Sequence, residues 1–167
     1  RWTAQGKIVT YLLVTDGEAG IDSMDPAECG PLRRQEEIDS AAIVGVEVVE
    51  FLGRPDGLVT ADIDLRRDLA GAIRRHRPDV VISINFGDHW GGRGWNHVDH
   101  RATGLALLDA ARDAGNRWLF TDVADPGTGV ETAVVGWQAE VKTEARIVIQ
   151  KMVLLIGVIR MIINVLT

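Results

Sequence analysis

The sequence predicts an α/β protein with a parallel sheet and helices on both of its faces. Three observations predict this class. Short apolar runs alternate with segments of helical spacing, the runs are apolar on both sides as buried parallel strands are, and Gly or Pro separates most of them. Right-handed crossovers make such strands parallel, and ligands lie beyond the strands' carboxyl ends. The loops that leave the strands are therefore the places to look for a site.

The amino-terminal part predicts a strand, a helix and a strand. Residues 7–14 are a nearly continuous β-branched and apolar run, and the polar loop 15–20 leaves it. A helix is predicted over residues 31–44, because a proline opens it and Gly45 stops it. Residues 46–51 are the second apolar run and predict the second strand.

The middle of the chain repeats this alternation. A Pro-Asp-Gly turn precedes residues 62–76, which carry Leu and Ile at helical spacing. Residues 79–84 predict a third buried strand that runs into the Gly-rich loop 87–94. A third helix is predicted over 99–114, where a glycine closes it, and a fourth strand over 117–123.

The carboxyl-terminal segment differs in composition, so we divide the chain into an α/β domain at 1–136 and a tail at 137–167. Residues 147–167 hold six Ile among 21 residues and predict a long apolar helix. Lys151 and Arg160 inside it disfavour a membrane span, because each charge costs a few kcal/mol near the bilayer centre. We expect a buried or homo-oligomer-forming helix, or a segment foreign to the fold.

Charge and cysteine content exclude some classes of partner. The 167 residues contain 18 Lys and Arg against 24 Asp and Glu, a net charge of −6, which argues against binding to nucleic acid. The whole imbalance lies within residues 16–40, either as a solvated loop or as the rim of a cation or polar-substrate site. Cys29, the single cysteine, fits a reducing, cytoplasmic compartment. The start of the sequence has no signal-peptide pattern.

Histidines gather in one predicted strand-end loop. His89, His97 and His100 lie between residues 87 and 100, whereas His76 ends a helix beside arginines. If a helix begins near Asp99, His97 and His100 can face one ligand, and Asp99 can cap the helix or fix an imidazole tautomer. One histidine would then bind a metal and the other would donate to an oxyanion. The alternative is that both are polar caps on a solvated loop.

Four motifs, in this order and spacing, resemble the LmbE-like de-N-acetylases. This superfamily includes N-acetylglucosaminyl-phosphatidylinositol de-N-acetylase (PIG-L) and the mycothiol-pathway deacetylases. The resemblance covers about residues 1–123. The motifs are Val14-Thr15-Asp16-Gly17-Glu18-Ala19-Gly20, Arg33-Arg34-Gln35-Glu36, Arg77-Pro78-Asp79-Val80-Val81-Ile82 and His97-Val98-Asp99-His100.

The resemblance implies a Rossmann-like fold and a zinc hydrolase that removes an acetyl or other small acyl group from an amino-sugar conjugate. It implies that His100 is a zinc ligand. His97 would stabilise the tetrahedral oxyanion or protonate the leaving amine, and Asp99 would orient it. For substrate binding it implies Arg33, with Glu36 holding that arginine, and the loop that carries Asp16.

One motif of the resembled family does not occur in this sequence. The family's first two zinc ligands and its general base come from a His-Pro-Asp-Asp motif after a first strand, which would precede residues 1–6. The resemblance thus implies that the family's first strand is missing here. It implies one zinc per chain only if the ligands of that motif are supplied. His100 by itself would bind zinc poorly.

Two other functions remain open at this point. A catalytically inert member of the fold could bind a polar ligand or form an oligomer through residues 147–167. A nucleotide-binding Rossmann enzyme is disfavoured, because no Gly-x-Gly-x-x-Gly joins a strand to a helix. Trp90 and Trp95 beside the Gly-rich loop could stack on a sugar ring or fold back on the core.

Overall fold

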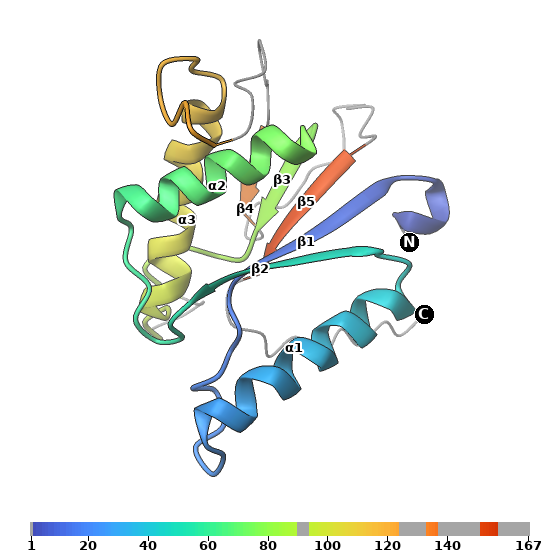
Figure 1. The fold of residues 1–167 in the computed structure, drawn as a ribbon, viewed down its shortest axis with the longest axis vertical. Helices are drawn as coiled ribbons and strands as arrows, with labels where there is room; N and C mark the ends of the chain where they lie inside the picture. Colours follow the sequence, from blue (N-terminus) through green and yellow to red (C-terminus); the bar gives the residue numbers. More distant parts are fainter. Residues whose placement is uncertain (1, 90–93, 124–132, 137–150, 157–167) are drawn as a thin grey trace.

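The computed structural model describes residues 2–89, 94–123, 133–136 and 151–156, and its strands build one parallel sheet. The described strands are β1 (Ile8–Thr15), β2 (Val48–Arg54), β3 (Val80–Ser83), β4 (Ala133–Gly136) and β5 (Lys151–Ile156). Their order across the sheet is β2-β1-β5-β3-β4 (Figure 1). The predicted α/β class with parallel strands is confirmed.

Helices cover both faces of this sheet, as expected. The helices are α1 (Pro26–Ile43), α2 (Ile63–His76) and α3 (Val98–Ala114), with a short 3-10 helix, η1 (Thr3–Gln5), before β1. α2 and α3 lie together on one face, and α1 lies on the other (Figure 1). Strand and helix alternate along the chain from β1 to α3, so each crossover carries the chain from one strand to the next parallel one.

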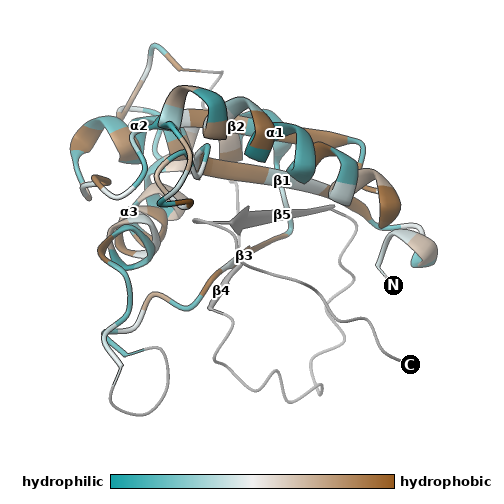
Figure 2. Ribbon diagram, turned by 90° about the horizontal axis from the view of Figure 1, so that it is seen from below, coloured by the Kyte–Doolittle hydropathy of each residue, from teal (hydrophilic) through white to brown (hydrophobic). Residues whose placement is uncertain are grey.

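β1 separates two apolar cores because its side chains alternate between the faces and both faces are covered. Leu12 and Val14 pack into the core under α2 and α3, whereas Tyr11 and Leu13 pack into the core under α1. β1 is accordingly apolar along most of its length (Figure 2), the pattern from which the sequence predicted a buried strand.

The first helix begins earlier than predicted. α1 starts at Pro26, and the Asp25 carboxylate caps it by accepting a hydrogen bond from the Ala27 N–H at 2.8 Å. Pro31 lies inside the helix. Both prolines suit a helix start, but Asp25-Pro26 combines a side-chain cap with a proline at the first position, and that stronger signal sets the boundary.

The strand predicted over residues 117–123 is wrong, because these residues form successive turns. Three carbonyls of this segment, those of Leu119, Phe120 and Val123, accept hydrogen bonds from a buried arginine of α2 and not from a neighbouring strand. Arg74 is 2% exposed and donates to six carbonyl oxygens, those of Asp113, Ala114, Asn116, Leu119, Phe120 and Val123. A basic residue near the end of an amphipathic helix gives no sign in the sequence that it will be buried.

The helix predicted over residues 147–167 is wrong for residues 151–156, which form β5. β5 pairs in parallel with β1 on one side, where Ile8 aligns with Lys151, and with β3 on the other, where Val80 aligns with Met152. A central parallel strand is apolar on both faces, and a short apolar run of this kind cannot be told from a buried helix by periodicity. Residues 147–150 and 157–167 lie outside the described residues.

A helix that spans a membrane is both long and apolar. None of the described helices, α1, α2 and α3, combines the length and the apolar character that crossing a bilayer requires.

Candidate functional site

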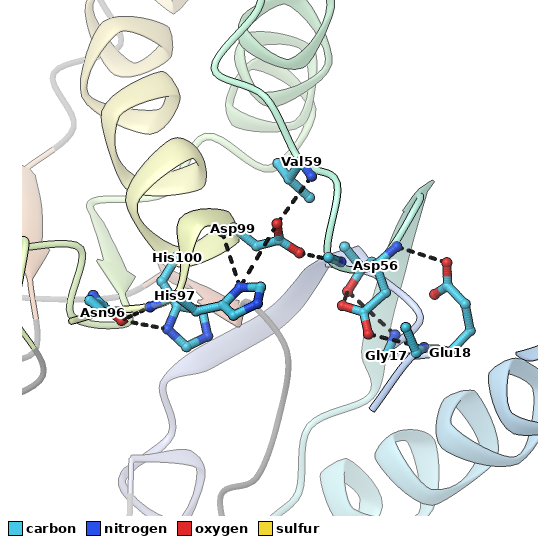
Figure 3. Close-up of polar contacts among 11 residues, drawn as sticks. Gly17, Glu18, Asp56, Val59, Asn96, His97, Asp99 and His100 are labelled. Carbon is cyan, nitrogen blue, oxygen red and sulfur yellow. Dashed lines mark hydrogen bonds and ion pairs between the residues drawn. The ribbon is translucent and has the colours of Figure 1, made fainter. Parts of the chain in front are cut away.

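The candidate site lies where the chain leaves the carboxyl ends of β1, β2 and β3. Three segments meet there: the loop after β1, the loop after β2 and the start of α3 (Figure 3). Hydrogen bonds join the three segments, and His97, Asp99 and His100 lie among them. This is the edge at which a parallel sheet binds its ligands.

Two asparagines hold the loop between β3 and α3. The Asn85 amide donates to the His89 carbonyl at 2.9 Å and accepts from the Gly87 N–H at 2.8 Å. The Asn96 amide donates to the carbonyls of Asn85 at 2.7 Å and Gly87 at 2.9 Å. Both asparagines are buried, so the histidines that follow Asn96 start from a fixed backbone position.

His97 is the N-cap of α3. Its backbone is extended, and its Nδ1 accepts a hydrogen bond from the Asp99 N–H at 3.2 Å. A neutral imidazole that accepts at Nδ1 carries its proton on Nε2. Half of the His97 side chain is exposed, so this Nε2–H donor is available to a ligand.

His100 lies one turn further along α3, and its ring centroid is 5.7 Å from that of His97. Its Nδ1 is 2.8 Å from Oδ1 of Asn96, an oxygen that also accepts from the His97 N–H at 2.9 Å. Since an amide oxygen can only accept, Nδ1 of His100 donates and Nε2 keeps its lone pair. The two histidines therefore present opposite chemistry, a donor on His97 and an acceptor or metal-ligating nitrogen on His100.

Asp99 ties the start of α3 to the loop after β2. Its side chain is 1% exposed, and its two oxygens accept from the N–H groups of Gly57 at 2.6 Å and Val59 at 3.1 Å (Figure 3). Its Oδ1 is 3.9 Å from Nδ1 of His97, which is too far for a hydrogen bond. Asp99 thus orients His97 through its backbone N–H, and its carboxylate anchors the neighbouring loop.

A second buried carboxylate, that of Asp56, joins the loop after β2 to the loop after β1. Asp56 accepts from the Thr15 hydroxyl at 3.2 Å and from the Ala19 N–H at 3.1 Å, and its own N–H donates to Glu18 at 2.8 Å. Burial raises the pKa of Asp56, and the nearby charges of Glu18 and Asp99 raise it further, while the two hydrogen bonds that it accepts oppose the rise. The three loops are therefore held as one unit.

The predicted substrate-binding residues gather at the loop after β1 and at α1. Arg33 forms the expected ion pair with Glu36, one turn along α1. Asp16 pairs with Arg34 at 3.1 Å, and the Arg34 guanidinium also lies over the Phe51 ring. These residues form their own cluster beside the loop after β1. The hydrogen bonds of Asp56 join that loop to the loop after β2, which Asp99 in turn joins to the start of α3.

Trp95 extends the histidine side of the site. It is 71% exposed, so it does not fold back on the core, and its ring lies 5.0 Å from that of His89 and 5.7 Å from the Arg101 guanidinium. Trp95 and His97 are both exposed, and the buried Asn96 lies between them in the sequence. Trp90 lies outside the described residues.

Sequence reasoning missed the residues that position the histidines. Asn96, Gly57 and Asp56 hold the histidines and the loops through amide, backbone and carboxylate hydrogen bonds. Asn96 could have been identified from the sequence, because it directly precedes His97-Val98-Asp99-His100 and a polar side chain next to a helix start often bonds to that helix's first turn.

The residues described here do not by themselves fit a zinc ion. Among them, no group of three or more His, Cys, Asp or Glu side chains is placed to hold a metal. His100 offers one imidazole nitrogen, whereas a catalytic zinc takes three protein ligands and a water.

Comparisons with known proteins agree with the fold. Residues 1–111 match the family of GlcNAc-PI de-N-acetylase, PIG-L. A diacetylchitobiose deacetylase of Thermococcus kodakarensis is 32% identical over 115 residues, which are 68% of this chain and 42% of that protein.

Two solved structures are similar to this chain. A conserved protein of Thermus thermophilus is 29% identical with a TM-score of 0.61, over 83% of this chain and 57% of that one. The N,N'-diacetylchitobiose deacetylase of Pyrococcus horikoshii, solved with an inhibitor, has a TM-score of 0.66 over 77% of this chain and 49% of that one. At 23% identity, it supports the fold alone.

The chain spans about half the length of these relatives. The family match covers two thirds of the chain and contains β1, β2, β3, most of α3 and both histidines of the site. The chain therefore belongs to the PIG-L family of de-N-acetylases.

Proposed function

We propose that this chain contributes to a hydrolase that removes an N-acetyl group from an amino sugar. The observation that carries the proposal is the pair of histidines at the start of α3, with a proton donor on His97 and a lone pair on His100. Family membership supports the reaction, and the curated relative is a deacetylase of diacetylchitobiose. The proposed substrate is therefore a small amino-sugar conjugate.

In this reaction the oxygen of a water molecule bonds to the amide carbonyl carbon, a proton of that water is transferred to the amide nitrogen, and the C–N bond breaks. The products are the free amine and acetic acid, which ionises to acetate. His97 donates a hydrogen bond from Nε2 to the carbonyl oxygen as negative charge develops on it, or passes that proton to the leaving nitrogen. Asp99 holds the loop that carries Gly57 and keeps His97 in place through its backbone N–H. Its carboxylate oxygens are both engaged, so we assign Asp99 a positioning role.

Zinc belongs to the same proposal, with His100 contributing one ligand through Nε2. Because the described residues do not complete a zinc site, the steps above are assigned to the protein's own groups. Arg33, with its partner Glu36, and Asp16 are proposed to bind polar groups of the substrate at the loop after β1.

The remaining proposals concern setting and assembly. The single cysteine, Cys29, is buried and fits a reducing cytoplasmic compartment. A homo-oligomer through residues 147–167 stays a proposal, as does the division of the chain at residue 136.

An assay of acetate release tests the proposed function. The 167-residue chain, with zinc supplied, is incubated with N,N'-diacetylchitobiose and with N-acetylglucosamine. Wild type should release acetate, and His97→Ala and His100→Ala should each lower the rate at least about 100-fold, as loss of an oxyanion donor or a ligand does.

His76→Ala is the matched control, because His76 pairs with Glu50 away from the site and should leave the rate unchanged. Acetate release that survives in both site variants contradicts the assignment of the histidines. Binding of the sugar without turnover in wild type would instead support a catalytically inert binding module.

A further inference from the structure

We propose that Asn96 is a positioning residue that determines which nitrogen of His100 carries the proton. The nitrogen of His100 without a proton is then Nε2. This inference rests on the proposed function for its purpose, but it concerns the position of one proton, which can be observed without substrate, metal or turnover.

The first step of the argument is that the Asn96 amide has only one possible orientation. Its nitrogen end lies against two backbone carbonyls, those of Asn85 at 2.7 Å and Gly87 at 2.9 Å, which only accept hydrogen bonds. Its other end faces the His97 N–H at 2.9 Å, which only donates. A rotated amide would oppose oxygen to oxygen and donor to donor, so Oδ1 must point toward His97 and His100.

The second step is that this oxygen dictates the state of His100. Nδ1 of His100 lies 2.8 Å from Oδ1 of Asn96 and must supply the proton of that hydrogen bond. A neutral imidazole has one proton, so Nε2 keeps its lone pair. An outer partner that fixes tautomer and ring orientation in this way is what a metal-ligating histidine needs.

The third step is that Asn96 is held too tightly to adapt. It is 4% exposed, and its side chain makes four hydrogen bonds, which use both of its donors and both acceptor positions of its oxygen. A buried amide that is satisfied in this way loses a bond in any other arrangement. The two histidines thus take opposite tautomers from two different neighbours, Asn96 for His100 and the Asp99 backbone for His97.

Nuclear magnetic resonance of the imidazole nitrogens tests the proposal. Long-range proton–nitrogen spectra of the ¹⁵N-histidine-labelled chain are recorded at pH 8, above the ordinary histidine pKa of about 6.5. Wild type should show His100 protonated on Nδ1 and His97 on Nε2. Finding His100 protonated on Nε2 in the wild-type chain overturns the inference. The proposed hydrolysis is tested independently, by acetate release.

Variants separate the oxygen of Asn96 from its general role in packing. Asn96→Ala should lose the Nδ1–H signature of His100 and keep that of His97 on Nε2, which serves as an internal reference. Asn96→Asp keeps the acceptor oxygen toward His100 and should retain the His100 signature, although its second oxygen faces the Asn85 and Gly87 carbonyls and should lower the stability of the loop. Asn85→Ala removes two hydrogen bonds from the same loop without touching His100, so its spectrum should match wild type at both histidines.

Two results contradict the proposal directly. One is an unchanged His100 signature in Asn96→Ala. The other is the same loss in Asn85→Ala as in Asn96→Ala, since loop packing would then set the tautomer. If Asn96→Ala does not fold, the comparison of wild type, Asn96→Asp and Asn85→Ala still decides between the two explanations.

Discussion

Glu37 is a carboxylate of α1 buried on the side of the helix that faces the sheet. Burial raises its pKa from 4.5 to about 7, and the Arg33 guanidinium offsets part of that rise. The pKa of Tyr11 on β1 is also raised, by its own burial first and then by the charge of Glu37. The acidic segment 16–40 therefore contains one carboxyl group that is half protonated near neutral pH, which the net charge of the sequence could not reveal.

Glu37 should make folding stability depend on pH. Its folded pKa lies above its unfolded value, so its favourable contribution is complete below pH 4.5 and is lost as pH rises through 7. Glu37→Gln removes this dependence. After a discount for solvent screening, we expect the variant to gain about 1–2 kcal/mol relative to wild type between pH 5 and pH 8.

The free energy of unfolding in urea at the two pH values measures this effect. Asp39→Asn is the matched control, because the exposed Asp39 of the same helix accepts a hydrogen bond from Gln35 at 2.8 Å, a surface pair worth up to about 0.5 kcal/mol. A difference between wild type and Glu37→Gln that is equal at both pH values would refute the prediction.

Trp95 is expected to contribute to sugar binding. Its exposed ring lies two residues before His97 in the sequence, and such a ring can pack on the apolar face of a sugar. Trp95→Ala should weaken binding of N,N'-diacetylchitobiose by about 1 kcal/mol, or several-fold, in a calorimetric titration. Trp118→Ala is the control, because it removes a similarly exposed tryptophan beyond the other end of α3. An equal loss of sugar affinity in Trp118→Ala would contradict a specific role of Trp95 in sugar binding.

Among the elements, α2 shows where prediction from sequence succeeds and where it fails. Its bounds were predicted within one residue, because Asp62 caps its start and leucines recur at helical spacing. Its most consequential contact was not predicted. Arg74 donates to six carbonyls at the end of α3 and in the turns after it, so a side chain more than 40 residues away helps to hold the turns of residues 117–123.

Arg74→Met should therefore be strongly destabilising. The substitution keeps most of the aliphatic volume but leaves buried carbonyl oxygens without donors, at a cost on the order of 3 kcal/mol or more. Arg75→Met is the control, since Arg75 is half exposed and bonds to Glu50 at 2.8 Å. Thermal unfolding that is equal for the two variants would show that the carbonyl cluster contributes little.

On the scale of the whole molecule, the sequence predicted the parallel α/β class and the histidine cluster, because both depend on local patterns. The alternation of apolar runs located β1, β2 and β3, and His97-Val98-Asp99-His100 located the start of α3. Asn96, Asp56 and Gly57 were not predicted, because their roles depend on which loops meet in space. The place of β5 was not predicted either, since a short apolar run does not encode its neighbours.

β5 should be required for folding, because it joins two halves of the sheet. Pairing in the described chain connects β2 and β1 to β3 and β4 only through β5. A chain truncated after residue 146 should lose cooperative unfolding and near-ultraviolet circular dichroism. Retention of a cooperative transition in the truncated chain would show that the sheet is stable without this strand.

The position of β5 also has a consequence for the order of events during synthesis. Ile8 and Lys151 are partners in the ladder although 142 residues separate them in the sequence. A nascent chain therefore carries β1 and β3 without this shared partner until β5 leaves the ribosome, and open edges invite pairing with other chains. Such a long-range closure also predicts slow folding, because its loop entropy is lost before the central contacts form.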